Sequence, residues 1–277
     1  KIEPNYKNSI ALHVLDASRS VGVVQNLLNK NKKDNFVNEI KKEYVKTRKR
    51  LKTKKKLKLL SFEEANHNRF IAQWSNPTTP SFLGSKNFNH IPISTLRKYI
   101  DWTPFFKTWD LAGSYPKILQ DSVVGTSATQ LFEDANKMLD KIEKQGKIKN
   151  KSVIGFWAAN SDDKNQVIIY KGEQRTKSIA AFNFPRQQRF QGKEKPNISL
   201  SDFIAPVKSG IKDYIGAFAV TSGIGVKEEC DKYEKNNDDY SSIMLKAVAD
   251  RLAEALAEYL HEKVRKEYWG YSKEESL

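Results

Sequence analysis

A long helical pattern near the C-terminal end of the sequence constrains the fold more than any other feature. Residues 249–271 read ADRLAEALAEYLHEKVRKEYWGY, and five alanines lie between positions 247 and 257. Alanine gives high helix propensity and lets neighbouring helices pack closely. Apolar residues recur here at intervals of three and four, which places them on one face of an α-helix: Leu245, Val248, Leu252, Ala255, Leu256, Tyr259 and Val264. We therefore predict a long helix with one buried face.

Two carboxylates lie off that face. Asp250 and Glu254 are four residues apart, and like charges at this spacing cost a few tenths of a kcal/mol. A positively charged ligand or partner would explain why both are present. The alternative is that they are ordinary exposed residues, with Lys246 partly compensating Asp250 and His261 on the same side of the helix.

Composition indicates a folded chain of one large domain, or one domain with a connecting segment. Hydrophobic residues make up 39% of the 277 positions, too many for a disordered chain. Cys230 is the single cysteine, so an internal disulfide is excluded and a reducing, cytoplasmic setting is expected. One cysteine and four scattered histidines give no zinc-ligand spacing.

We expect no membrane span or signal peptide in this sequence. Its first residue is Lys, which suggests a piece of a longer polypeptide.

The positive charge is concentrated in one segment. Residues 41–58 contain eleven Lys or Arg and one Glu, which accounts for +10 of the net +15. The basicity therefore belongs to a local arm. The arm fits a solvated linker helix best, an acidic protein partner second and nucleic acid third, because Tyr44 is its single aromatic residue for base stacking.

The order of the expected elements favours an α+β fold. Residues 9–24 resemble the edge of a preceding module followed by a connector, and Asp34 to about Lys56 has a helical pattern with a thin apolar stripe. We predict a loop over residues 75–92, where Pro77, Pro80, Gly84 and Pro92 fall. Helices are expected at 126–145 and from about 238 to 268. Short β-branched or aromatic runs predict strands at 152–159, 166–170, 177–184 and 214–221, with a hairpin turn at 160–165. Strands grouped between helices predict a mainly antiparallel central sheet flanked by helices, with an N-terminal helical linker.

The segment 100–119 carries the second candidate site. Asp101 precedes Trp102, so its carboxylate could hold an ammonium or sulfonium group beside an aromatic surface. The alternative is that Asp101 caps a helix with Pro104 in its first turn. Elsewhere, Gly223 and Gly225 lack the pattern of a phosphate-binding loop and favour a strand-to-loop turn.

Several segments together resemble the C-terminal activation domain of cobalamin-dependent methionine synthase. They are HVLDASRSVGVV at 13–24, LRKYIDWTPFFKTWDLAGSYPKIL at 96–119, DANKMLDKI at 134–142, DFIAP at 202–206, DYIGAFAV at 213–220 and KAVADRLAEALAEYLHEKVRKEYWGY at 246–271. The resemblance implies a domain that binds S-adenosylmethionine and presents its methyl group to cobalamin held by the preceding domain. There, oxidised cob(II)alamin is reduced and methylated to methylcobalamin. Cobalt is the nucleophile in this reaction, so the resemblance implies no catalytic side chain and no metal ligand, zinc included, in this chain; the protein contributes positioning.

The resemblance also assigns roles to the acidic residues. Asp101 matches an S-adenosylmethionine ligand, Glu254 a second acidic residue of that site, and Asp250 a carboxylate at the interface with the cobalamin domain. The family has an Arg-x-x-x-Gly-Tyr loop that also holds the ligand; the sequence ends at Leu277 before one, and KEYWGY at 266–271 is a different motif. Near Gly225 the family can offer another interface acid, but Val226 and Lys227 give no basis for placing it here.

These expectations give a domain plan and a set of partners. Residues 1–62 are expected to be the end of the preceding module and the basic linker, and residues 63–277 the activation domain, truncated at its C-terminus. The implied partners are the cobalamin-binding domain of the same polypeptide and flavodoxin or another acidic electron donor, which the basic arm would attract. The competing hypothesis is a non-enzymatic binding module whose arm recruits an acidic protein or nucleic acid.

Overall fold

The computed structural model of the protein describes residues 11–14, 17–53, 58–192 and 194–275. The chain divides into two compact units, Lys1–Leu60 and Ser61–Leu277. Within its described residues, the first contains two helices that contact each other, α1 (Ala17–Leu28) and α2 (Lys33–Thr53). The predicted apolar stripe of α2 is only half-buried at Phe36, Val37, Ile40 and Tyr44, and exposed at Val45 and Leu51. A helix with so little buried surface gains little from packing within its own unit.

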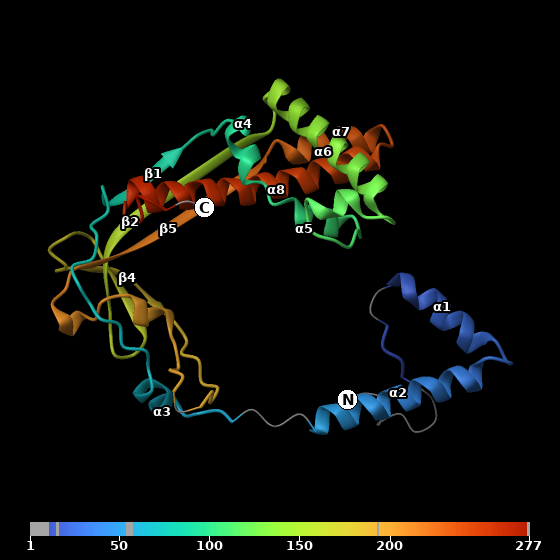
Figure 1. Ribbon diagram of the computed structural model, residues 1–277, viewed down its shortest axis with the longest axis horizontal. Helices are drawn as coiled ribbons and strands as arrows, with labels where there is room; N and C mark the ends of the chain where they lie inside the picture. The colour runs from blue at the N-terminus through green and yellow to red at the C-terminus, as the bar shows by residue number, and fades with distance from the viewer. Residues whose placement is uncertain (1–10, 15–16, 54–57, 193, 276–277) are drawn as a thin grey trace. The chain divides into compact units, whose positions relative to one another are not determined.

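The second unit combines helices with one five-stranded antiparallel sheet (Figure 1). Its α-helices are α3 (Phe62–His67), α4 (Ile93–Leu96), α5 (Trp102–Thr108), α6 (Gly125–Gln145), α7 (Val226–Lys235) and α8 (Asp239–Lys263). Short 3₁₀ segments are η2 (Arg97–Tyr99), η3 (Lys117–Gln120), η4 (Leu200–Phe203) and η5 (Val207–Ser209), and a π-helical turn, η6 (Val264–Tyr268), follows α8. The strands are β1 (Gly84–Phe88), β2 (Lys149–Ser161), β3 (Gln166–Tyr170), β4 (Ser178–Asn183) and β5 (Asp213–Ile224).

The long strand β2 organises the sheet. It pairs with β5 over most of its length, and separate parts of it pair with β1 and then β3, which in turn pairs with β4. The register places Ser152 opposite both Phe88 and Val220. Because side chains alternate across a strand, Ile154 and Phe156 point to one face, where both are buried in the core.

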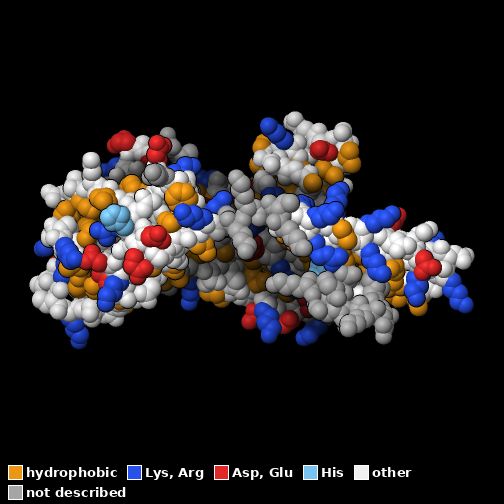
Figure 2. Space-filling view, turned by 90° about the horizontal axis from the view of Figure 1, so that it is seen from below, with side chains coloured by type: hydrophobic (Ala, Val, Ile, Leu, Met, Phe, Trp, Pro, Cys, Tyr) orange, Lys and Arg blue, Asp and Glu red, His pale blue; other side chains and the backbone are white. Residues whose placement is uncertain are grey.

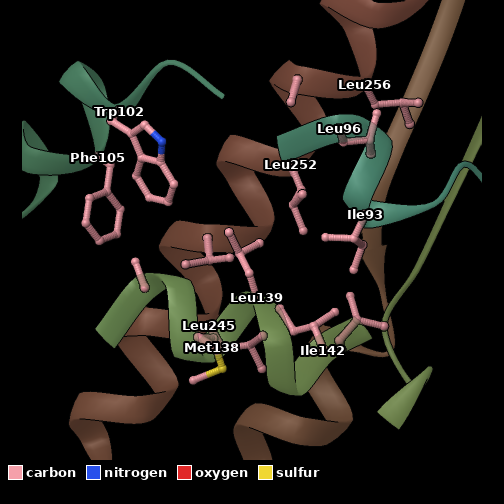
Figure 3. Packing of buried hydrophobic residues seen from close by; sticks show 14 of the residues in the cluster. Ile93, Leu96, Trp102, Phe105, Met138, Leu139, Ile142, Leu245, Leu252 and Leu256 are labelled. Atoms are coloured by element: carbon pink, nitrogen blue, oxygen red, sulfur yellow. The ribbon is translucent and has the colours of Figure 1, made fainter. Parts of the chain in front are cut away.

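Helix α8 joins the sheet to the other helices (Figure 1). It packs on β5 and also contacts α4, α5, α6 and α7. Leu252 and Leu256 of α8 lie beside Ile93 and Leu96 of α4, and Met138, Leu139 and Ile142 of α6 lie nearby (Figure 3). The face predicted from the three-and-four spacing is the one that packs: Leu245, Val248, Leu252, Ala255 and Leu256 are buried, and Tyr259 and Val264 are partly buried against the same core.

The α+β class and the mainly antiparallel sheet are confirmed. The four predicted strands lie at β2 to β5, and the predicted helix at 126–145 is α6. Pro104 lies in the first turn of α5 and Pro116 immediately precedes η3, so the segment 100–119 forms two short helices instead of one. The predicted hairpin turn at 160–165 connects β2 to β3.

Three local predictions were wrong. Residues 84–88, placed in a loop, form β1 because they pair with β2 and not because of their own propensity. Helix α1 occupies residues interpreted as a connector. Gly225 does not begin a loop: it is the N-cap of α7, with a left-handed φ of 88°. The helix predicted from about 238 to 268 is present as α8 and the π-helical turn η6, which replaces regular helix from Val264 to Tyr268.

Candidate functional site

Asp101 lies at the start of α5, between η2 and the first buried residue of that helix. Its Oδ1 atom accepts a hydrogen bond from the backbone N–H of Thr103 at 2.9 Å. The helix-cap alternative is therefore what the structure shows. The side chain is exposed, and Oδ2 makes no hydrogen bond or ion pair with the part of the chain that the structure describes. Capping and ligand binding are thus compatible, because they use different oxygens.

Trp102 does not provide the aromatic surface expected beside Asp101. It is only 7% exposed, and its ring packs edge-on against Phe105 and Phe132 at centroid distances of 5.4 and 4.9 Å. The close-up view shows Trp102 and Phe105 together on the inner side of α5 (Figure 3). The cap residue faces solvent while the next residue anchors the helix in the core. Trp102 therefore fixes the position of Asp101 and is not available for cation–π contact with a ligand.

Asp250 and Glu254 share one counterion, the guanidinium of Arg251. Arg251 Nη2 lies 2.6 Å from Asp250 Oδ2, and Nη1 forms an ion pair with Glu254. The acids are 70% and 51% exposed in their side chains, whereas Arg251 is 13% exposed. The expectation that Lys246 compensates Asp250 was wrong, because Lys246 pairs with Glu234 of α7. The acidic pair is accessible from solvent but is not without a partner.

Contacts between η2 and α8 bring the Asp101 segment onto the acidic helix. The rings of Tyr99 and Tyr259 meet edge-to-face at 5.6 Å, and the Tyr99 hydroxyl donates a hydrogen bond to Glu262. Helices α5 and α8 also touch directly. Among the described residues, no hydrogen bond or ion pair joins Asp101 to Asp250 or Glu254. The three acids thus belong to packed elements without being linked to one another.

The pair Tyr99 and Glu262 is the feature that sequence reasoning missed. Glu262 also accepts from Lys266 Nζ at 2.8 Å. The hydrogen bond from Lys266 and, to a smaller extent, the one from Tyr99 lower the pKa of Glu262 to about 2. Burial and, to a smaller extent, the hydrogen bond to Glu262 raise the pKa of Tyr99 to about 12. The Glu-to-Lys spacing of four residues was visible in the sequence. The partner Tyr99, 163 positions away, was not.

Two hollows of the described surface lie away from these acids. One, of ≈ 400 Å³, lies between β1, β2 and β5 and includes Asn87 and Lys151; another, of ≈ 590 Å³, borders α3 and includes Phe62 and Arg69. Neither is lined by Asp101, Asp250 or Glu254. No cluster of three potential metal ligands occurs within the described ranges. In the same part of the chain, no helix is both long and apolar enough to cross a bilayer.

Comparison with known proteins identifies the class. Residues 92–277 match the family model described as "Vitamin B12 dependent methionine synthase, activation domain". This match covers well over half of the 277 residues, so the chain belongs to that family. It contains the activation domain of a cobalamin-dependent methyltransferase, and the expected family and fold are confirmed.

A solved structure supports the same assignment. The protein is similar to the molecule in "Crystal Structure of the MetH Reactivation Domain bound to AdoHcy", with 48% sequence identity and a TM-score of 0.76. The match covers 79% of this chain and 67% of that chain.

Proposed function

We propose that this domain binds S-adenosylmethionine, with Asp101 and Glu254 as acidic contacts. The observation that carries the proposal is the exposed carboxylate of Asp101, held at a helix cap through one oxygen with the other open. The similar reactivation domain was crystallised with AdoHcy, the product formed when S-adenosylmethionine loses its methyl group. Glu254 lies on α8, the helix against which the Asp101 segment packs.

The chemistry of this ligand suits exposed carboxylates. S-adenosylmethionine carries a sulfonium and an ammonium group, and a fixed carboxylate near either one retains the ligand more strongly as water is excluded. Glu254 already pairs with Arg251. A ligand ammonium would therefore share Glu254 with Arg251 or displace it, whereas Asp101 offers an oxygen with no ion pair to break. This difference makes Asp101 the stronger of the two contacts.

Methyl transfer in this proposal belongs to the whole 5-methyltetrahydrofolate–homocysteine methyltransferase. When bound by the neighbouring domain, cobalamin supplies the cobalt that takes the methyl group as S-adenosylmethionine becomes S-adenosylhomocysteine. Residues of this chain hold the methyl donor in line, which is the main requirement of such a displacement. Asp250, the more exposed acid of α8, would contact the cobalamin domain, placing the two halves of the reaction one helical turn apart.

Calorimetric titration of the full-length protein with S-adenosylmethionine tests the site. Asp101→Asn keeps a side-chain oxygen for the cap but removes the charge, so we expect about tenfold weaker binding with an unchanged melting temperature. Asp110→Asn is the matched control: Asp110 is exposed at the other end of α5 with a φ of 57°, a conformation that Asn also accepts. Equal affinities for wild type and Asp101→Asn would remove Asp101 from the site.

The basic arm supports a second part of the proposal, an acidic electron donor such as flavodoxin. Figure 2 shows Lys and Arg side chains spread over the unit that contains α2. A cationic surface of this kind would speed the encounter with an acidic protein in a salt-dependent way. The lysines at 54–56 lie outside the described residues, and neutralising them in the full enzyme should slow flavodoxin-driven reactivation most at low salt. An unchanged rate and salt dependence would contradict this role.

Three further parts of the hypothesis remain predictions. We place the boundary between linker and activation domain at residues 62 and 63, close to the division after Leu60. A cytoplasmic location is expected from the single cysteine. Family membership favours the activation domain over the non-enzymatic binding module. Salt-sensitive RNA binding without saturable S-adenosylmethionine binding would reverse that preference.

A further inference from the structure

The position of Asp101 relative to α8 depends on the short segment that joins η2 to α5. Asp101 follows η2, a single 3₁₀ turn with no buried residue, and precedes α5, which has seven residues. On the α5 side, Trp102, Phe105 and Phe106 anchor the helix in the core. On the η2 side, Tyr99 and Ile100 are partly buried against the core, and Tyr99 also reaches α8 through the hydrogen bond of its hydroxyl. What holds Tyr99 therefore also limits how far Asp101 can move.

Tyr99 is held to α8 by two different contacts. Its ring meets the edge of Tyr259 at 5.6 Å, and its hydroxyl donates to the Glu262 carboxylate. Glu262 is itself held by Lys266 at 2.8 Å, one helical turn further on. The Nζ atom of Lys98 lies 5.1 Å from the centre of the Tyr99 ring. The ring contact and the hydrogen bond together fix both the position and the orientation of the Tyr99 side chain on α8.

The geometry of α8 places this contact about two turns from Glu254 along the same helix. Eight residues separate Glu254 from Glu262, which is about 12 Å along the helix axis and about 80° around it. Tyr99 precedes Asp101 by two residues, and two residues of backbone span at most about 7 Å. Asp101 therefore stays close to the anchored tyrosine. Tyr99 and Glu262 therefore connect the segment of one proposed ligand contact to the helix of the other.

We infer that the hydrogen bond from Tyr99 to Glu262 positions Asp101 for S-adenosylmethionine binding. This inference rests on the proposed function, because it assigns a positioning role within the same site. Tyr99 and Glu262 act through Asp101 and need not touch the ligand. Between the pKa of Glu262, about 2, and the pKa of Tyr99, about 12, Glu262 is ionised and Tyr99 is neutral. The Tyr99 hydroxyl is therefore the donor and the Glu262 carboxylate the acceptor throughout this pH range.

The test is a double-mutant cycle on ligand affinity in the full-length protein. Tyr99→Phe keeps the ring contact with Tyr259 and removes only the hydroxyl, so we expect S-adenosylmethionine to bind about three- to tenfold more weakly. In protein that already carries Asp101→Asn, adding Tyr99→Phe should weaken S-adenosylmethionine binding by less than a further factor of about two, because the effect of Tyr99 passes through Asp101. In reductive reactivation, Tyr99→Phe should raise KM for S-adenosylmethionine and leave kcat unchanged.

Tyr240→Phe is the matched control. Tyr240 also donates to a carboxylate, Asp134 Oδ2 at 3.0 Å, and has its pKa raised to about 12 by burial and by that bond. Its loss should leave ligand affinity within a factor of about two while changing stability by an amount similar to Tyr99→Phe. If Tyr99→Phe does not fold, Glu262→Met removes the acceptor of the same bond at similar side-chain length and should give the same affinity loss.

The outcomes separate this inference from the proposed function. Wild-type protein that shows no saturable binding would overturn both. Wild-type binding that is unaffected by Tyr99→Phe and Glu262→Met would overturn only the positioning role. An equal loss in the presence and absence of Asp101→Asn would overturn it as well, because the effect would then not depend on Asp101.

Discussion

Arg251 lies between the acids of helix α8, with its Nη2 atom 2.6 Å from Asp250 Oδ2 and its Nη1 atom paired with Glu254. The guanidinium allows two carboxylates to occupy one helix turn without strong mutual repulsion. It also keeps both carboxylates close to a fixed positive charge. A cationic ligand or partner group would therefore meet carboxylates that are already oriented.

Removing this shared counterion should destabilise the domain. Arg251→Gln leaves Asp250 and Glu254 repelling each other and removes packing from a side chain that is largely covered. We expect the free energy of unfolding to fall by about 1 kcal/mol, measured by urea denaturation. Lys246→Gln, which removes the exposed pair with Glu234, is the control and should cost less than about 0.5 kcal/mol. Similar losses in both variants would argue against the shared-counterion role.

The two acids of α8 should separate in function. Glu254→Gln is expected to weaken S-adenosylmethionine binding about threefold, less than Asp101→Asn, because Arg251 already satisfies part of the carboxylate. Asp250→Asn should leave that affinity unchanged and slow reductive reactivation in the full enzyme. Calorimetry and single-turnover reactivation measure the two effects. A weaker affinity in Asp250→Asn would move that residue to the ligand side.

The carboxylate of Glu262 should make stability depend on acid pH. Its pKa in the folded protein is about 2, below the ordinary value of 4.5. Folding therefore favours the ionised form, and this contribution is present above pH 4.5 and lost as the pH falls toward 2. We expect the difference in unfolding free energy between wild type and Glu262→Gln to shrink by about 1 kcal/mol over that window. A difference independent of pH would show that Glu262 is not a stabilising ionised group.

Leu256 should be among the residues most sensitive to truncation. It is fully buried and packs with Leu252 and with Leu96 of α4. Leu256→Ala should cost about 2–5 kcal/mol, through lost burial and the cavity that remains. Ile243→Ala on the same helix removes a side chain that is 47% exposed and should cost less than about 1 kcal/mol. Denaturant unfolding of both variants checks the burial assigned to each face of α8.

Gly225 should not tolerate a side chain. Its φ is 88°, and a Cβ atom there would lie 2.4 Å from the backbone oxygen of Lys147. Backbone atoms cannot move aside as a flexible side chain can, so Gly225→Ala should destabilise the domain by about 2–3 kcal/mol. Gly223→Ala is the matched control, because the nearest atom to its added Cβ is 3.7 Å away. Equal stabilities for the two variants would contradict the close approach at Gly225.

Sequence periodicity was sufficient for elements whose own residues carry the pattern. Leu252 and Leu256 were assigned correctly because three-and-four spacing forces them onto one face of any helix. The same spacing could not locate β1 or the partner of Lys246. Residues 84–88 become a strand only through pairing with β2, and Lys246 turns toward Glu234 only because α7 folds back on α8.

The sequence by itself determined the family, the α+β class and the acidic residues to consider, since these depend on residue types and on spacing along the chain. The tertiary structure alone decided what each acid contacts. It caps α5 with Asp101, buries Trp102, pairs Asp250 and Glu254 with Arg251, and attaches the Asp101 segment to α8 through Tyr99 and Glu262. Contacts such as the last one join residues 163 positions apart. No local pattern specifies them, because they exist only once the helices have packed.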